Sequence, residues 1–250
     1  MKKITALFAV MIFLGLLCQA QTVDDIIAKN MEVKGGIEKL RTIKTNKIVG
    51  KMAMMGFETN VTMWYKEPAM MKMEMVIAEK LMTFGYDGKT AWQISPMTGS
   101  DDPQEVTGAQ AEQVKDNADM MSDPLVDYKK KGFTIDLEGK EDMEGTPVYK
   151  LKLTKKDGKV VYYFIDAENY IELKTEMTRT VNDREMTTET FFGDFKEVDG
   201  VMMAHSMTIK MNGQDMGNIT LESVELNVPL DDNFFKMPPK KAAPQAEPEK

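Results

Sequence analysis

The feature that most constrains the fold of this chain is a long series of segments in which apolar and polar residues alternate with a period of two. Two-residue turn signals join several of these segments: Asp87-Gly88, Asp157-Gly158, Asp199-Gly200 and Asn212-Gly213. Such dipeptides readily adopt the backbone angles of tight hairpins, so consecutive strands are expected to be antiparallel neighbours. The chain is therefore predicted to be mainly β.

The predicted strands fall into two series. The first comprises residues 43–55, 57–66, 69–78, 80–86 and 90–95, and the second comprises residues 133–140, 146–155, 159–166, 170–180, 185–198, 201–211 and 215–227. We expect an α+β fold, mainly β, built on one large curved antiparallel sheet. This sheet would be an incomplete β-barrel whose concave face is covered by helices.

Helical spacing appears before and between the two series. Apolar residues after Thr22, which is a good helix cap, predict a helix that Gly35-Gly36 ends, followed by a short one to about Leu40. A weakly apolar stripe from Val106 to Met121, with Asp102-Pro103 and Thr107 as alternative starts, predicts a third helix. Residues 125–131, preceded by Ser122-Asp123-Pro124 and followed by Gly132, predict a fourth.

The two ends of the chain differ from the middle. Residues 1–20 combine Lys2 and Lys3 with an apolar run and a small-residue ending, the order of a secretory signal peptide cleaved before Gln21. A lipoprotein signal acylated at Cys18 is the alternative, but Leu17 stands where that processing needs a small residue. Residues 21–237 would form one domain, and the Pro- and Ala-rich residues 238–250 a disordered tail. We therefore expect a periplasmic protein that is not an integral membrane protein.

Composition excludes several classes of function. Without residues 1–20, 30 of the 32 basic side chains remain against 40 acidic ones. Strong binding of nucleic acid needs a stripe of basic residues, and the sequence contains none. The only cysteine, Cys18, lies in the leader, and the only histidine is His205. Disulfides, thiolate nucleophiles and multi-histidine sites are thereby excluded. Because no G-x-S-x-G motif accompanies His205, we expect a non-enzymatic protein without a cofactor.

Methionine is abundant, with 24 residues in the chain. On one predicted strand Met71, Met73 and Met75 share a face. They are either ordinary sheet core or the flexible lining of a cavity that repacks around ligands such as acyl chains. The predicted cavity is lined by Met52, Met54, Met63, Met71, Met73, Met75, Trp92 and Ile94, and is covered by Met120, Met121 and Leu125.

Four residues at odd-numbered positions of a later predicted strand lie on one face of it: Met203, His205, Met207 and Met211. Methionine and neutral imidazole are ligands of Cu(I), so a copper-binding protein is a remote alternative. A single histidine in a sheet is more simply a hydrogen-bonded structural residue.

The order of these segments resembles a known family. The likeness covers nearly all of residues 23–238 and rests on AKNMEVKGGIEKLRTIKTNKIVGKM, DMMSDPLVDYKKKGFTIDLEGKE, YKLKLTKKDGKVVYYFIDAENYIELK, FGDFKEVDGVMMAHSMTIKMNG and DDNFFKMP. These segments together resemble the LolA-like outer-membrane lipoprotein-sorting proteins. The resemblance implies an incomplete β-barrel whose concave face receives the acyl chains of a lipoprotein in the periplasm, with residues 107–131 as a lid.

The expected function is therefore that of a periplasmic lipid or lipoprotein carrier. Its partners would be an acylated lipoprotein or lipid, an inner-membrane donor and an outer-membrane acceptor. The same fold also serves, by resemblance, in sensing, so a non-enzymatic envelope sensor or protein-interaction module is the alternative. Relative to the family the chain is longer and carries Met where bulky aliphatic and aromatic lining is expected.

Overall fold

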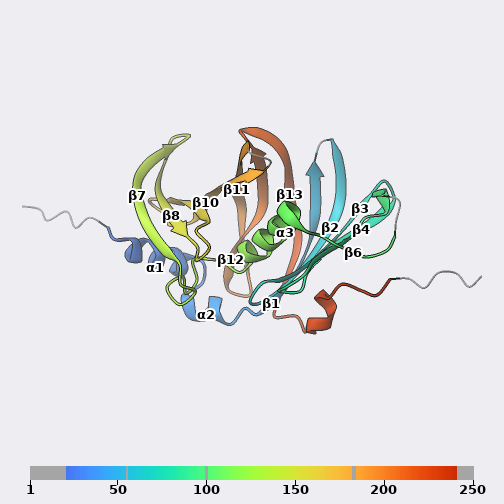
Figure 1. The fold of residues 1–250 in the computed structure, drawn as a ribbon. Coiled ribbons are helices and arrows are strands. Elements are labelled where there is room, and N and C mark those ends of the chain that lie inside the picture. Colours follow the sequence, from blue (N-terminus) through green and yellow to red (C-terminus); the bar gives the residue numbers. More distant parts are fainter. Residues whose placement is uncertain (1–20, 55, 99–100, 182–183, 241–250) are drawn as a thin grey trace, which may run out of the picture.

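The computed structural model describes residues 21–54, 56–98, 101–181 and 184–240. The predicted leader and residues 241–250 of the predicted tail lie outside the described residues. The described part forms one sheet of thirteen antiparallel strands in the order β6-β5-β4-β3-β2-β1-β13-β12-β11-β10-β9-β8-β7. Figure 1 shows this sheet strongly curved, with α3 lying inside the bend. The prediction of a mainly β fold with an incomplete barrel is confirmed.

The elements follow the predicted segments closely. The strands are β1 (Thr45–Met54), β2 (Phe57–Lys66), β3 (Met70–Ile77), β4 (Lys80–Tyr86), β5 (Ala91–Ile94), β6 (Gln104–Glu105), β7 (Thr134–Met143), β8 (Thr146–Thr154), β9 (Val160–Asp166), β10 (Glu172–Val181), β11 (Arg184–Val198), β12 (Val201–Met211) and β13 (Gln214–Leu226). The helices are α1 (Val23–Val33), α2 (Ile37–Arg41) and α3 (Gly108–Met121), with short 3-10 helices η1 (Pro96–Thr98) and η2 (Asp232–Phe235). Among the described strands, β6 alone was not predicted, because a strand of two residues is too short to show an alternating pattern.

Helix α1 begins where its cap residue predicts. The Thr22 side chain accepts a hydrogen bond from the Asp25 backbone, and the Asp25 side chain accepts one in return, which is a complete capping box. The helix ends before Gly35 and Gly36, which both have positive φ angles. A Cβ at Gly35 would lie 2.2 Å from the carbonyl oxygen of Gly200, so only glycine permits this approach of α1 to the β11–β12 turn.

The prediction of a helix over residues 125–131 is wrong, because this segment consists of turns. Asp123 and Asp127 have φ angles of 45° and 52°, which interrupt right-handed helical geometry. The Asp127 carboxylate is held instead by Arg41, whose Nε and Nη2 donate hydrogen bonds of 2.9 and 2.7 Å. The tertiary ion pair therefore replaces local helix formation.

The core divides into three clusters on the concave face. The first, which we call the α1 cluster, packs α1 and α2 against β8, β9 and β10, around Ile26, Leu151 and Tyr163. The second, the α3 cluster, packs α3 against β3, β4 and β5, around Met71, Tyr86 and Ala118. The central cluster lies between them on β13, β1 and β2 and contains Ile48, Val61, Met63, Ile219 and Leu221. Helices thus cover both ends of the concave face.

Candidate functional site

The strand register brings most of the predicted methionines onto one surface. Met63 is paired with Met73 across β2 and β3, and Val61 is paired with Met75. Met52 is paired with Ile219 of β13, which is in turn paired with Met207 of β12. Since cross-strand partners share a face, these side chains form a continuous apolar surface on the concave side. We call this set the methionine surface: Met52, Met63, Met71, Met73, Met75, Met207, Ile209 and Ile219.

Burial differs along the methionine surface. Met63, Met71 and Met75 are buried, at 9%, 4% and 6% exposure. Met52 and Met73 are only half-buried, although they pack against the central cluster. Met54, at the end of β1, is 41% exposed. Part of the methionine surface is therefore packed against protein, whereas Met52 and Met73 remain partly accessible.

Two predicted lining residues lie on the other face of the sheet. Trp92 is paired with Gly85 and Ile94 with Thr83, whereas Met71 and Met73 are paired with Tyr86 and Phe84. Trp92 is 1% exposed and donates a hydrogen bond to the carbonyl of Phe235 in η2. The structure therefore does not bring Trp92 and Ile94 together with the methionine surface.

The three predicted covering residues lie over different parts of the concave face. Met121 packs against both the central cluster and the α3 cluster. Met120 packs against the α1 cluster, where Tyr163 Oη lies 4.0 Å from its sulfur. Leu125 is fully buried in that same cluster. Only Met121 therefore borders the methionine surface directly.

Ion pairs attach α3 to the opposite side of the bend. Asp116, whose side chain is 1% exposed, lies 2.9 Å from Lys159 Nζ and 3.1 Å from Arg179 Nε. Lys159 also pairs with Glu112 at 2.7 Å, and Lys155 pairs with Asp119 at 3.2 Å. Burial lowers the pKa of Lys159, but its hydrogen bonds to the two acids outweigh this and raise it. These residues were not predicted from the sequence, in which their only signal is an acidic face on a weakly apolar helix.

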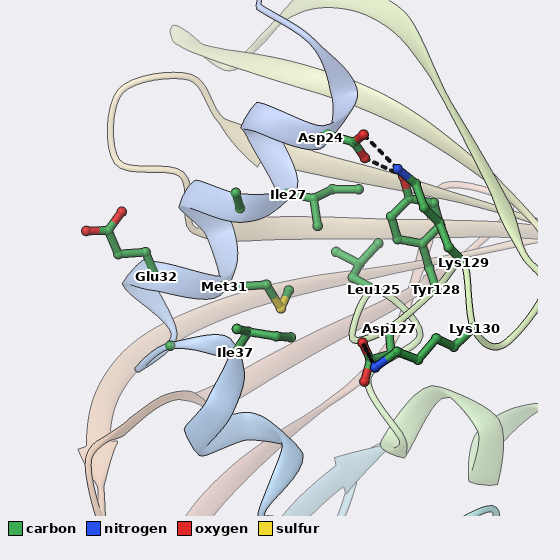
Figure 2. Close-up of a pocket in the computed structure, with 12 residues that line it drawn as sticks. Asp24, Ile27, Met31, Glu32, Ile37, Leu125, Asp127, Tyr128, Lys129 and Lys130 are labelled. Atoms are coloured by element: carbon green, nitrogen blue, oxygen red, sulfur yellow. Dashed lines mark hydrogen bonds and ion pairs between the residues drawn. The ribbon is translucent and has the colours of Figure 1, made fainter.

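A separate cavity of about 530 Å³ lies between α1 and the 125–130 segment. Figure 2 shows Ile27, Met31, Ile37 and Leu125 pointing into it, with charged pairs at its rim. Asp24 pairs with Lys129 at 2.7 Å, and Asp127 pairs with Lys130 at 3.1 Å. Of the lining residues, only Leu125 was predicted from the sequence.

Beside α1, one half-buried lysine faces two carboxyl groups. Lys34 pairs with Asp123 and lies 3.9 Å from Glu172. Burial raises the pKa of Glu172 to about 7, with Lys34 opposing the shift and Asp123 adding to it. Glu172 therefore changes its charge near neutral pH, next to the start of the 125–130 segment.

The residues of the copper alternative do not converge on one point. Met203 packs against the α1 cluster and Met207 against the central cluster. His205 is buried, and its Nδ1 lies 3.0 Å from the carbonyl oxygen of Met203. Among the described residues, no group of three or more His, Cys, Asp or Glu side chains is arranged to hold a metal ion.

The described helices include none that is both long and apolar enough to cross a membrane. No curated protein matches the chain. Solved structures with a similar fold include a LolA superfamily protein from Nitrosomonas europaea, with a TM-score of 0.58 and 16% identity over 87% of this chain and 98% of that one. A DUF1329 family protein from Desulfovibrio piger has a TM-score of 0.56 and 14% identity, over 87% and 98% of the two chains.

A domain from Vibrio parahaemolyticus described as an outer membrane lipoprotein-sorting protein has a TM-score of 0.54 and 12% identity, over 84% of this chain and 94% of that one. At these identities the likeness establishes the LolA-like fold. A protein-family model described as "Uncharacterized protein" matches residues 93–238, more than half of the chain. The chain belongs to this family, and its fold is LolA-like.

Proposed function

We propose that this protein is a non-enzymatic carrier that binds the acyl chains of a lipid or lipoprotein on the methionine surface. The observation that supports this most is the continuity of that surface from β12 to β3, with Met52 and Met73 left partly accessible. A lipoprotein-sorting domain among the structures of similar fold agrees with it.

The chemistry of the surface suits acyl chains of varied shape. Each CH2 group that leaves water contributes about 0.8 kcal/mol, provided that its surroundings are apolar. Methionine side chains are unbranched and polarizable, and they repack around different ligands at low cost. The methionine surface therefore favours apolar chains without fixing their length.

The cellular setting is part of the proposal. Cleavage of residues 1–20 as a signal peptide would deliver the carrier to the periplasm. There it would receive its cargo from an inner-membrane donor and pass it to an outer-membrane acceptor. Residues 107–131, which include α3, would cover the bound chains as a lid.

Displacement of a fluorescent fatty acid tests the proposal. Met73→Gln places a polar group on the methionine surface and should weaken probe binding about fivefold to tenfold. Met70→Gln is the matched control, because Met70 precedes Met71 on β3 and faces the other way. If Met73→Gln binds as wild type does and Met31→Gln does not, the cavity beside α1 is the binding site and the proposal is wrong.

A further inference from the structure

Three cationic side chains meet on the concave side of the sheet, at the turn between β8 and β9 and on β10. They are Lys155, Lys159 and Arg179, which we call the cationic cluster. Their nearest partners are acids of α3: Asp119 for Lys155, Glu112 and Asp116 for Lys159, and Asp116 for Arg179. Lys159 also lies 3.7 Å from Asp157 of its own turn. The cluster is therefore held mainly by a helix that packs against the sheet elsewhere through apolar contacts.

The pairing at the centre of the cluster is imperfect. Arg179 Nε and Asp116 Oδ2 are 3.1 Å apart, yet neither atom makes a hydrogen bond to any described residue. Asp116 is 1% exposed and Lys155 is 4% exposed, so both ions have lost most of their hydration. A buried ion pair recovers that loss only when its hydrogen bonds are complete. Helix α3 is thus a suboptimal partner for Arg179.

The cationic cluster borders the apolar part of the concave face. Arg179 follows Met177 on the same face of β10 and is paired with Met186 of β11. Thr188 stands two residues further along β11 and is paired with Met211 of β12. A ligand whose chains lie on the methionine surface can therefore place a polar end at Arg179.

We infer that the cationic cluster binds the anionic phosphate head group of an acyl lipid, which replaces the acids of α3. The inference rests on the proposed function and names the class of its cargo. A phosphate presents oxygens that fit the planar guanidinium of Arg179 in a bidentate manner, which the single Asp116 carboxylate does not achieve here. Lys155 and Lys159 supply two further charges. Head-group binding and displacement of α3 are then one event, so that an anionic lipid opens the lid that covers its own chains.

The test compares two lipids with identical short acyl chains, phosphatidylglycerol and the diacylglycerol that lacks its phosphate head group, both kept below the concentration at which they aggregate. Each displaces a fluorescent fatty acid from the full-length mature protein. We expect phosphatidylglycerol to displace the probe about tenfold more strongly, as one good charge-assisted hydrogen bond predicts. Free glycerol 3-phosphate should not displace the probe, because it lacks acyl chains.

Variants test which residues cause the preference for phosphatidylglycerol. Arg179→Gln combined with Lys159→Gln should bring the two lipids to equal affinity, whereas Lys210→Gln, on β12 and paired with Asp215, should leave the preference intact. Asp116→Asn weakens the competing helix and should strengthen binding of both lipids.

The possible outcomes separate failure of the head-group inference from failure of the proposed function. Equal binding of the two lipids by the wild type overturns the inference and leaves the proposed function standing. A preference that survives the double variant places the head group elsewhere and also overturns it. Displacement by glycerol 3-phosphate points to a free-phosphate site instead. If neither lipid displaces the probe, the proposed function fails as well.

Discussion

The indole Nε1 of Trp92 donates a 2.8 Å hydrogen bond to the carbonyl oxygen of Phe235, which fastens η2 to the outer face of β5. Directly opposite on β4 stands Gly85, where a Cβ would lie 2.2 Å from the indole ring. Beside them, Trp64 and Phe234 pack edge to face with centroids 5.3 Å apart. These aromatic contacts therefore fix η2 on the convex side of the sheet.

Gly85→Ala should destabilise the fold by about 1–3 kcal/mol, since the new methyl group meets a rigid ring that is itself packed against η2. A denaturant melt measures the change. Gly193→Ala is the control, because a Cβ there would meet only the hydroxyl of Ser206 at 3.0 Å. Equal losses in the two variants would show that Trp92 does not restrict Gly85.

The Arg41–Asp127 pair should give an acid-dependent stability. Hydrogen bonding from Arg41 lowers the pKa of Asp127 to about 2, against burial, which raises it. A depressed carboxyl pKa stabilises the fold above the unfolded value of 3.8, and this contribution disappears as the pH falls towards 2. Because both side chains are partly exposed, we expect Asp127→Asn to cost only about 1 kcal/mol at pH 7.

Thermal melts of wild type and Asp127→Asn between pH 7 and pH 2 check this. The difference in unfolding free energy should be constant above about pH 5 and should have lost most of its size at pH 2. An undiminished difference at pH 2 would mean that the carboxylate charge is not what stabilises the 125–130 segment.

Glu172 should act in the opposite direction. Its folded pKa of about 7 lies above the ordinary value of 4.5, so the folded state holds a proton that the unfolded state releases. Stability contributed by this group is therefore greatest below pH 4.5 and falls as the pH rises through 7. Glu172→Gln should be more stable than wild type at pH 8 by up to about 3 kcal/mol, and equal to it at pH 4. Melts at the two pH values measure this, and a gain that is the same at both would contradict the raised pKa.

The three methionines of β3 should not respond alike to truncation. Met71 and Met75 are buried against protein, so replacement by Ala should cost about 2–5 kcal/mol, as in a packed core. Met73 is half-buried and has fewer neighbours to lose, so Met73→Ala should cost clearly less. Urea denaturation of the three variants provides the comparison. A core-like loss for Met73 would mean that no part of this stripe is open to a ligand.

Local pattern was enough to predict most of the sheet. The alternation in segments such as β3 and the turn signals at Asn212-Gly213 determine strand pairing over a few residues. They were sufficient to predict the open sheet and most of the methionine surface. The helix predicted over 125–131 failed because Arg41, far away in the chain, binds Asp127 and stabilises a left-handed backbone there.

The candidate site was harder to predict. The face of the sheet on which a side chain lies, and the segment that covers it, depend on residues that are distant in the chain. Trp92 was expected beside Met73, but its face is decided by η2, some 140 residues further along the chain. The role of Asp116 depends on Lys159 and Arg179, which reach it only after the sheet has curved. No spacing in the sequence carries that information.

Whether acyl chains lie on the methionine surface can be measured by NMR of the methionine methyl groups in the presence of a spin-labelled fatty acid. Each methyl group reports its own distance from the label. We expect the signals of Met52, Met73, Met121 and Met207 to broaden, and those of Met70 and Met202, whose side chains face the other side of the sheet, to remain sharp. Broadening confined to Met31, or equal broadening on both faces of the sheet, would contradict it.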